Sequence, residues 1–199
     1  MKERIGLDLD SVLSYTEQTI ADYALAHYDV VIDWEKVEKY ELECFPGFTE
    51  ETGLQFKKDI ESGVVVRDVP PHENAESATM RLREAGFEIW IMTSRPFNLE
   101  METVDWLIKH NIQFDEAVLV PSADKCFVAR DLNLKAFVED RYDTLVNIKE
   151  CCGNLLYGLY LVTQPWNKNS FDNCINRVDN VLEAVNYIIR RKLIHGSGM

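Results

Sequence analysis

The 199-residue sequence lacks both a long apolar run and an excess of positive charge. None of its apolar stretches approaches the roughly 20 residues that a bilayer-spanning helix needs. Lys and Arg number 21 against 34 Asp and Glu, which gives a net charge of −13. Anionic membranes and nucleic-acid backbones repel such a chain. We therefore expect no membrane association and no stable nucleic-acid binding. A metal cation and a few Lys or Arg side chains in one pocket could still bind a small anionic substrate.

Metal-binding cysteine patterns and targeting signals are also missing. The five cysteines include no Cys-x-x-Cys pair and the four histidines are scattered, so the ligand spacing of a zinc site is absent. The first residues, Met1–Arg4, lead directly into an apolar run rather than into a signal-peptide core. We expect reduced thiols and a cytoplasmic location. We interpret the adjacent Cys151 and Cys152 as buried thiols near a helix end.

Strand-length and helix-length patterns alternate along most of the chain. Nearly continuous apolar runs are typical of parallel strands covered on both faces. Their alternation with amphipathic stretches predicts a doubly wound α/β sheet with right-handed crossovers. The expected strands are Ile5–Leu9, Glu88–Met92, Ala117–Val120, Ala136–Val138 and Leu155–Val162, and the expected helices are Asn74–Ala85, Leu99–Asn111, Ala123–Leu132, Thr144–Cys152 and Val178–Leu193.

Residues 14–71 break this alternation. They hold two helical patterns, Thr16–Tyr28 and Thr49–Ile60, and only Val64–Val66 resembles a strand. A segment this long needs structure of its own. Because ligands bind at the carboxyl ends of strands in open α/β sheets, we interpret it as a helical cap over a site. Residues 1–13 and 72–194 would then form the core domain. The cap aromatics either pack together, which we favour, or stack on a substrate: Trp34, Tyr40, Phe45, Phe48 and Phe56.

Two carboxylates, Asp8 and Asp10, stand at the end of the first expected strand. Residues i and i+2 of a strand share a face, so the two side chains would face one cavity. A hard cation such as Mg²⁺ would offset their repulsion. One carboxylate could then attack phosphorus while the other transfers a proton. Taken alone, a strand followed by an ordinary turn accounts for the pair equally well.

Three further motifs follow later strands. Thr93-Ser94-Arg95-Pro96 offers hydroxyl and amide groups for phosphate oxygens. Lys125 begins an expected helix against the helix dipole, which indicates that its charge is used elsewhere. Glu139, Asp140 and Asp143 follow the fourth strand and suggest the second half of a cation site. Singly, a polar turn, a solvated lysine and a helix cap at Asp143 explain them as well.

The order of these motifs resembles the haloacid dehalogenase superfamily of aspartate-nucleophile phosphatases, and the segment after the first motif resembles its helical C1 cap. The resemblance implies a Rossmann-like core with strand order 5-4-1-2-3. Within the superfamily the chain is most similar to the 5′(3′)-deoxyribonucleotidase-like group. One departure is Ser11, because the usual pattern has glycine after the second Asp. The stretches that carry the closer similarity are Arg67–Pro71, Met92–Pro96, Phe137–Asp140, Leu161–Val162 and Pro165–Asn167.

The resemblance also implies a reaction, namely Mg²⁺-dependent hydrolysis of phosphoric monoesters through an aspartyl-phosphate. Asp8 would attack phosphorus, and Asp10 would protonate the leaving oxygen and then activate water. Thr93 would hydrogen-bond the phosphoryl group, and Lys125 would offset negative charge. Lys135 is a weaker candidate for the lysine, because it precedes its strand and lies far from the carboxyl tip.

Metal and substrate contacts follow from the same resemblance. Mg²⁺ would be held by the carboxylates of Asp8 and Asp140 and by the backbone carbonyl of Asp10. The expected substrate is a nucleoside monophosphate. The oligomeric state stays open between a monomer and a homodimer, although C1-capped relatives often pair. Two other functions stay open, namely a phosphatase for another small metabolite such as a sugar phosphate, and a catalytically silent module that binds a phosphorylated ligand. Auxiliary roles fall to Glu139 and Asp143 near the metal and to Ser94 and Arg95 near the substrate.

Overall fold

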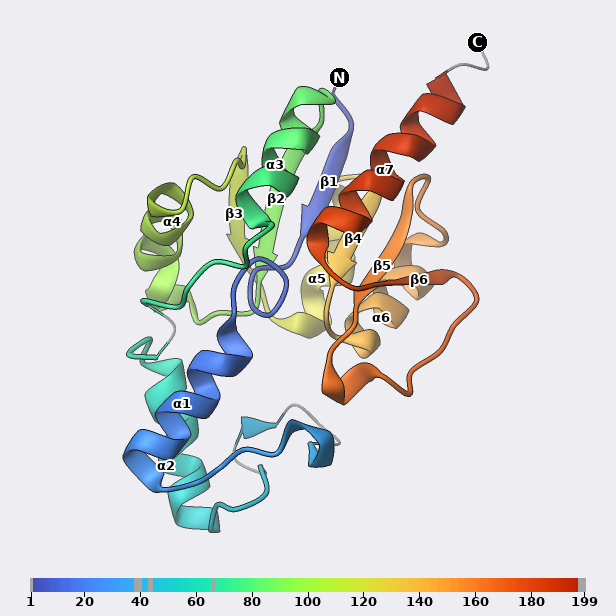
Figure 1. Cartoon of the computed structure of the whole chain (residues 1–199). Coiled ribbons are helices and arrows are strands. Elements are labelled where there is room, and N and C mark those ends of the chain that lie inside the picture. The colour runs from blue at the N-terminus through green and yellow to red at the C-terminus, as the bar shows by residue number, and fades with distance from the viewer. Residues whose placement is uncertain (1, 38–40, 43–44, 66, 197–199) are drawn as a thin grey trace.

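A six-stranded parallel sheet forms the centre of the computed structural model, which describes residues 2–37, 41–42, 45–65 and 67–196 (Figure 1). The strand order is β3-β2-β1-β4-β5-β6. Read from the other edge, the order is 6-5-4-1-2-3, so β1 to β5 lie in the predicted order 5-4-1-2-3 and β6 extends the sheet beyond β5. The doubly wound α/β fold is thus confirmed. The strands are β1 (Arg4–Leu7), β2 (Glu88–Thr93), β3 (Glu116–Leu119), β4 (Ala136–Glu139), β5 (Gly158–Val162) and β6 (Ile175–Val178).

The edge strand β6 is the element that sequence patterns missed. Its four residues include two polar ones, Asn176 and Arg177, so it carries no apolar run. It pairs with β5 in register Leu159 to Ile175. Residue 178, expected at the start of the last helix, therefore ends a strand.

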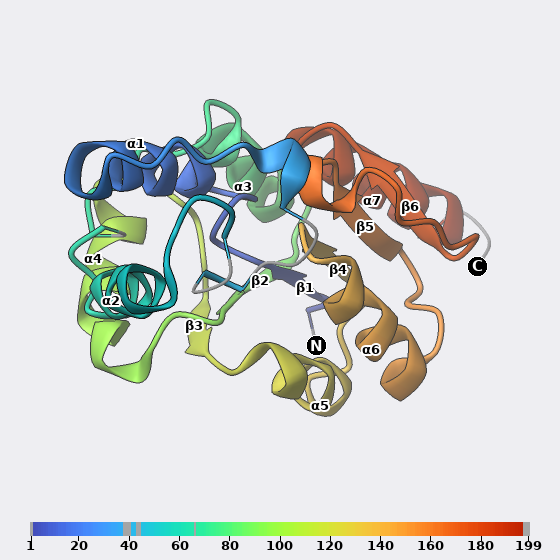
Figure 2. The same cartoon turned by 90° about the horizontal axis from the view of Figure 1, so that it is seen from below.

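Helices lie on both faces of the sheet (Figure 2). Those on one face share a core cluster with alternate strand residues, and α5 and α6 share a second cluster on the other face. None of the helices among the described residues combines the length and apolarity needed to cross a bilayer. The helices are α1 (Thr16–Tyr28), α2 (Glu50–Glu61), α3 (Ala75–Glu84), α4 (Glu100–Lys109), α5 (Lys125–Asp131), α6 (Tyr142–Cys152) and α7 (Val181–Gly196), with short 3₁₀ turns η1 (Trp34–Lys36), η3 (Phe97–Leu99), η4 (Ser122–Asp124) and η5 (Pro165–Asn167).

Side chains of the central strands alternate between the two clusters. Ile5 and Leu7 belong to the cluster under α3, α4 and α7, whereas Phe137 belongs to the cluster under α5 and α6. Gly6 faces Phe137, and a Cβ placed at Gly6 would lie 2.3 Å from its ring. Phe137 therefore requires glycine at this position of β1, because a bulkier residue would displace the ring from the core.

Two polar residues that directly precede expected helices, Asn98 and Ser122, do not cap them in the structure. Asn98 lies within the 3₁₀ turn that precedes α4, and Leu99 is the N-cap residue, without a side-chain hydrogen bond. Ser122 lies in η4, and its hydroxyl hydrogen-bonds the hydroxyl of Thr144 at 2.7 Å instead of capping α5. In both places the chain tightens into a 3₁₀ turn before the α-helix starts, which is common at helix N-termini.

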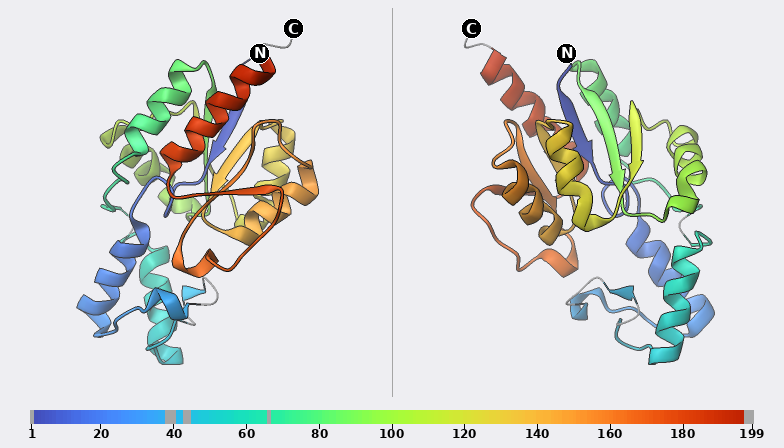
Figure 3. Two further views of the ribbon diagram at one scale, coloured as in Figure 1. Left: turned by 45° about the vertical axis from the view of Figure 1, so that its right-hand side comes forward. Right: turned by 180° about the vertical axis from the view of Figure 1, so that it is seen from behind.

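The α1–α2 segment lies beyond the carboxyl ends of the strands, below the sheet in Figure 1 and in both views of Figure 3. It has its own buried cluster, in which Phe56 is fully buried and stacks on Phe48 with ring centroids 4.6 Å apart. Trp34 packs on Phe45 and also contacts Trp166 of η5. The aromatic residues of this segment that the structure describes thus pack together. Residue 40 lies outside the described ranges, as does residue 66 of the weak strand pattern.

Two short links join this segment to the sheet. Ser14 forms isolated bridges with Asp10 and with Pro71. The amide of Tyr15 donates to the carbonyl of Pro70 at 3.0 Å, and the amide of His72 donates to Leu13 at 2.8 Å. The chain therefore leaves and re-enters the core side by side, directly next to the tip of β1.

Candidate active site

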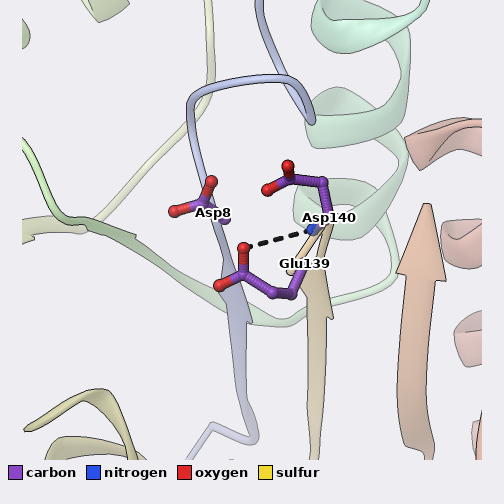
Figure 4. Close-up of side chains that lie close together, drawn as sticks. All are labelled: Asp8, Glu139 and Asp140. Atoms are coloured by element: carbon purple, nitrogen blue, oxygen red, sulfur yellow. Dashed lines mark hydrogen bonds between the residues drawn. The ribbon is translucent and has the colours of Figure 1, made fainter. Parts of the chain in front are cut away.

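Three carboxylates gather at the carboxyl ends of β1 and β4 (Figure 4). Asp8, Glu139 and Asp140 each offer a carboxylate oxygen within 4.8 Å of the others, and all three residues are buried. Their proximity follows from the sheet, because β1 and β4 are parallel neighbours and the amide of Asp8 donates to the carbonyl of Val138 at 2.9 Å. The sequence expectation that Asp8 and Asp140 lie together therefore agrees with the structure.

Lys125 supplies a positive charge to this group. Its Nζ donates to Oδ1 of Asp8 at 2.5 Å and to Oε2 of Glu139 at 2.9 Å. Only 2% of the residue is exposed, so both bonds are shielded from water. The alternative lysine, Lys135, instead donates to the exposed Asn133. The unfavourable position of Lys125 in the first turn of α5 was thus a useful sequence signal.

Burial and crowding make these acids reluctant to ionise. Burial, reinforced by the nearby Glu139, raises the pKa of Asp8 to about 7 despite its bond to Lys125. Burial and the charges of Glu139 and Asp8 raise the pKa of Asp140 well above its ordinary value. Burial alone would lower the pKa of Lys125, but Asp8 and Glu139 outweigh it and raise that pKa. One ammonium is therefore too little charge for three carboxylates, and the all-oxygen donor set fits a hard divalent cation such as Mg²⁺.

Glu139 is oriented by donors on both of its oxygens. Oε1 accepts from the amides of Asp140 and Arg141 at 3.1 and 3.2 Å, while Oε2 accepts from Lys125. Asp143 differs, because it is exposed and pairs with the guanidinium of Arg141 at 2.8 Å. Of the two acids expected to assist the metal, Glu139 lies in the cluster and Asp143 lies outside it.

Asp10 points to a different set of partners. Nε of Arg95 donates to Oδ2 at 3.0 Å and Nη2 donates to Oδ1 at 2.8 Å. Hydroxyls of Thr16 and Thr93 donate to the same carboxylate at 2.7 and 3.3 Å. Burial opposes ionisation, but the Arg95 charge and these bonds outweigh it and hold the pKa of Asp10 below its usual range. Asp10 is therefore an ionised carboxylate in this arrangement.

Sequence reasoning missed two of these contacts. Arg95 was expected to position substrate, yet it binds Asp10 in a two-pronged ion pair. The adjacency of β1 and β2 could have suggested this, since their carboxyl tips meet in a parallel sheet. Nothing in the sequence pattern singled out Thr16, the first residue of α1. Thr93 is fully buried, and its hydroxyl also accepts from the amide of Arg95 at 3.2 Å.

A cavity of about 380 Å³ opens over the carboxylates. Its floor comes from the strand tips and from Ser94, whereas its opposite wall comes from α1, α2 and the segment between them. The site residues that line it are Asp8, Asp10, Ser94, Arg95, Lys125, Glu139 and Asp140, and the opposite wall includes Thr16, Ile20, Glu41, Leu42, Lys57, Ile60 and Glu61.

Ser11, the departure from the family pattern, adopts the backbone conformation that glycine usually supplies. Its φ is +60°, in the left-handed region, and the residue is buried at the turn after β1. The carbonyl of Ser11 accepts from Nε2 of Gln164 at 3.0 Å. The turn is therefore kept with a small polar residue at the steric cost that any side chain meets there.

Comparisons with known proteins agree with this geometry. No protein-family model matches the chain. A Bacillus subtilis protein named "Putative nucleotidase YqfW" is 25% identical over 189 residues, which span 95% of each chain.

Solved structures show the same fold. A structure titled a "predicted phosphatase" from Clostridium acetobutylicum has a TM-score of 0.64 at 19% identity and covers 96% of this chain and 99% of its own. A haloacid dehalogenase-like family hydrolase from Xanthomonas campestris has a TM-score of 0.60 at 14% identity and covers 100% and 95%. The fold of this chain is thus the haloacid dehalogenase fold, and the predicted resemblance to haloacid dehalogenase phosphatases of nucleotidase-like character is confirmed.

Proposed function

We propose that this chain is a Mg²⁺-dependent phosphomonoesterase that hydrolyses nucleoside monophosphates. The observation that carries the proposal is the buried group of Asp8, Glu139 and Asp140 with Lys125 between them, at the floor of a ligand-sized cavity. Three crowded carboxylates beside one ammonium favour a divalent cation together with an anionic substrate. The similarity to a nucleotidase-named protein over 95% of both chains supports the nucleotide substrate.

The metal would be held by carboxylate oxygens of Asp8 and Asp140 and by the backbone carbonyl of Asp10. Bound there, Mg²⁺ would polarise the phosphoryl group and offset its negative charge. Glu139 would orient Lys125 and the backbone at Asp140, because its two oxygens are already occupied by those donors.

Asp8 is the nucleophile of the proposed reaction. Its Oδ atom attacks phosphorus, the bond from phosphorus to the ester oxygen breaks, and an aspartyl-phosphate forms. Lys125 favours the ionised form of Asp8 and orients it through the 2.5 Å bond to Oδ1. The pKa of Asp8 is about 7 without metal, so a large fraction of the side chain is protonated at neutral pH. A bound cation would lower this pKa and so increase the fraction of the ionised, nucleophilic form. Ser94 and Arg95, which line the cavity, position the phosphoryl oxygens.

Asp10 handles protons in both half-reactions. It protonates the leaving oxygen and later takes a proton from the water that attacks the aspartyl-phosphate. While Arg95 donates hydrogen bonds to both of its oxygens, Asp10 is ionised and cannot act as a proton donor. Donation therefore requires the Asp10–Arg95 pair to separate, and an incoming phosphate, which binds guanidinium strongly, would draw Arg95 away.

Residues 14–71 serve as the cap of the proposed enzyme. The wall that they contribute is partly apolar, through Ile20, Leu42 and Ile60, and would contact the leaving group rather than the phosphate. Cavities of 300 to 1,000 Å³ are typical of small-molecule sites, so about 380 Å³ suits a mononucleotide better than a polymer. A phosphatase for another small metabolite and a silent binding module are the alternatives.

Hydrolysis of p-nitrophenyl phosphate tests the reaction. We expect turnover with Mg²⁺, loss of turnover with EDTA, and loss in Asp8→Asn. Asp131→Asn, which removes the same charge from an exposed position on α5, should retain full activity. Metal-independent turnover, or an active Asp8→Asn variant, would contradict the mechanism. A chain that binds phosphate but never turns over would instead be the silent module.

A substrate panel tests the leaving group. Nucleoside 5′- and 3′-monophosphates should be hydrolysed with higher kcat/KM than sugar phosphates of similar charge. Ile60→Ala in the cavity wall should lower this preference while changing p-nitrophenyl phosphate turnover little. Hydrolysis of sugar phosphates without hydrolysis of nucleotides would replace the nucleotidase proposal with the sugar-phosphatase alternative.

We also propose that two copies of the chain pair through α4. Met101 and Ile108 of α4 are 78% and 63% exposed and stand seven residues apart, which places them on one helix face. Phe97, in the 3₁₀ turn before the helix, is 70% exposed. In an antiparallel pairing centred near residues 104–105, Met101 faces Ile108 and Glu100 faces Lys109 of the other copy, so the charges match as well. Light scattering after gel filtration should give a dimer, and Ile108→Glu a monomer. Leu25→Glu, an exposed leucine on α1, serves as the control.

A further inference from the structure

We propose that Cys126 and Cys151 form a reversible disulfide on exposure to a peroxide, and that this bond lowers activity through Lys125. The coupling to activity rests on the proposed phosphatase function, whereas bond formation does not. The two thiols come from helices that pack side by side, α5 and α6 (Figure 2). Their Sγ atoms lie 2.7 Å apart, with Cys151 donating toward Cys126.

A neighbouring thiol makes the pairing specific. Cys152 is adjacent to Cys151 in sequence, but its Sγ is directed to the backbone carbonyl of Cys126 at 3.6 Å. A bond between the adjacent Cys151 and Cys152 would require a strained eight-membered ring. Cys174 lies apart and interacts with Lys149. Among the described cysteines, Cys126 and Cys151 are therefore the pair that geometry brings together.

The two sulfurs differ in access. Cys126 is 4% exposed, and burial together with the Cys151 thiol raises its pKa to about 11. Cys151 is partly exposed, so an oxidant reaches it first. Peroxide transfers one oxygen to Cys151, giving a sulfenic acid and water. The Cys126 sulfur then attacks the Cys151 sulfur, the sulfur–oxygen bond breaks, and the hydroxyl leaves as a second water with the Cys126 proton.

The bond would act on the site because Cys126 follows Lys125 directly in the first turn of α5. A disulfide draws the sulfurs to about 2.05 Å, which is shorter than the present contact. The first turn of α5 then shifts toward α6, and Lys125 is displaced from Asp8 and Glu139, whose bonds to it are 2.5 and 2.9 Å. A displacement of about 1 Å in a catalytic group can cost ~10²-fold in rate, so a shift of part of that distance should lower kcat roughly tenfold.

Peptide mapping tests the bond itself. The full-length chain is treated with hydrogen peroxide, alkylated with N-ethylmaleimide and digested with trypsin without reductant. We expect a cross-link between peptides 126–130 and 150–168 whose fragments identify residue 151. Its mass should be two hydrogens below the sum of the two peptides with residue 152 alkylated, and dithiothreitol should reverse it. Cys151→Ser and Cys126→Ala should abolish it, and Cys174→Ser should not. Alkylated Cys126 after peroxide, or a bond between residues 151 and 152, would overturn the proposal.

Turnover of p-nitrophenyl phosphate on the same samples tests the coupling. Oxidation should reduce kcat roughly tenfold in the unchanged chain and in Cys174→Ser, with recovery by dithiothreitol, whereas Cys151→Ser should keep its rate. Since residue 151 is partly exposed, that variant is expected to fold even if Cys126→Ala does not. A complete cross-link with unchanged kcat would overturn the coupling. A reduced chain without any turnover would instead fail the phosphatase proposal, and the cross-link would still be read by mass.

Discussion

Arg95 holds both carboxylate oxygens of Asp10, at 3.0 Å through Nε and 2.8 Å through Nη2. This pair joins the tip of β1 to the loop after β2. The arrangement gives the second aspartate of the first motif a different environment from Asp8, whose partner is an ammonium and whose neighbours are acids. Two carboxylates two residues apart are thereby prepared for different tasks, as separated pKa values allow.

Substitutions at Arg95 test whether its planar guanidinium, rather than its charge alone, is needed for activity. Arg95→Lys keeps the charge but loses the planar two-pronged contact, so kcat/KM for p-nitrophenyl phosphate should fall ~10-fold. Arg95→Ala should cost ~10²-fold or more, because both Asp10 and the phosphate lose a charged partner. Arg130→Lys, which removes an exposed fork on α5, is the control. Equal rates for Arg95→Lys and the unchanged chain would show that charge alone suffices.

Lys125 should matter for stability as well as for rate. Lys125→Met keeps the length of the side chain but leaves Asp8 and Glu139 without their shared donor. Removing one partner of a buried ion pair costs about 3–5 kcal/mol, and protonation of an acid would offset part of that. We expect a lower melting temperature and at least ~10²-fold lower kcat. Lys135→Met, a half-buried lysine that directly precedes β4 and lies far from its carboxyl tip, should change neither.

Magnesium should stabilise the folded chain in the absence of any substrate. A ligand that binds only the native state adds RT ln(1 + [L]/Kd), about 2.7 kcal/mol at a hundredfold excess over Kd. Thermal melts with and without Mg²⁺ should therefore separate, and EDTA should close the gap. Asp140→Asn should abolish the metal-dependent shift, whereas Asp143→Asn should retain it, because Asp143 lies outside the carboxylate cluster. A retained shift in Asp140→Asn would place the ion elsewhere.

The stability of the α1–α2 segment should depend on pH through Tyr28 and Asp59. The Tyr28 hydroxyl donates to Asp59 at 2.5 Å, and Tyr23 donates to the same oxygen at 3.1 Å. The Tyr28 bond lowers the pKa of Asp59, so its contribution is present above the unfolded pKa of about 4 and is lost as pH falls through the folded value. Burial, with Asp59, raises the pKa of Tyr28 to about 12, so that contribution is present below about 10 and is lost between 10 and 12.

Melting temperatures across this range test the pair. Stability should be greatest between about pH 5 and pH 9, and Tyr28→Phe should lower it there by about 1 kcal/mol while flattening the loss at high pH. Tyr187→Phe, on the exposed side of α7, is the matched control. If Tyr28→Phe loses stability at alkaline pH as steeply as the unchanged chain, another titrating group causes that loss.

Sequence patterns anticipated the parts of this molecule that repeat along the chain. Five strands were readable because each carries a short, nearly continuous apolar run, as strands of a covered parallel sheet do. Asp8, Lys125 and Asp140 could be brought together because parallel strands end at one edge. The strand β6 was not readable, since Asn176 and Arg177 interrupt its apolar residues.

Contacts that depend on side-chain direction were beyond such patterns. The Arg95–Asp10 pair needs a particular loop path after β2, and the Thr16–Asp10 bond needs α1 to start beside the tip of β1. Ser11 shows the same limit, because a sequence pattern marks the residue as unusual without revealing that its φ is positive.

The Thr16–Asp10 bond implies that α1 and α2 tolerate substitution to different degrees. Thr16, the first residue of α1, hydrogen-bonds Asp10, which transfers protons in the proposed reaction, so changes there would disturb that reaction for every substrate. Lys57, Ile60 and Glu61 of α2 line the opposite wall of the cavity, away from Asp10. Mutations in α2 can thus refit the enzyme to a new metabolite while its chemistry stays intact, and divergence among paralogues should concentrate in that helix.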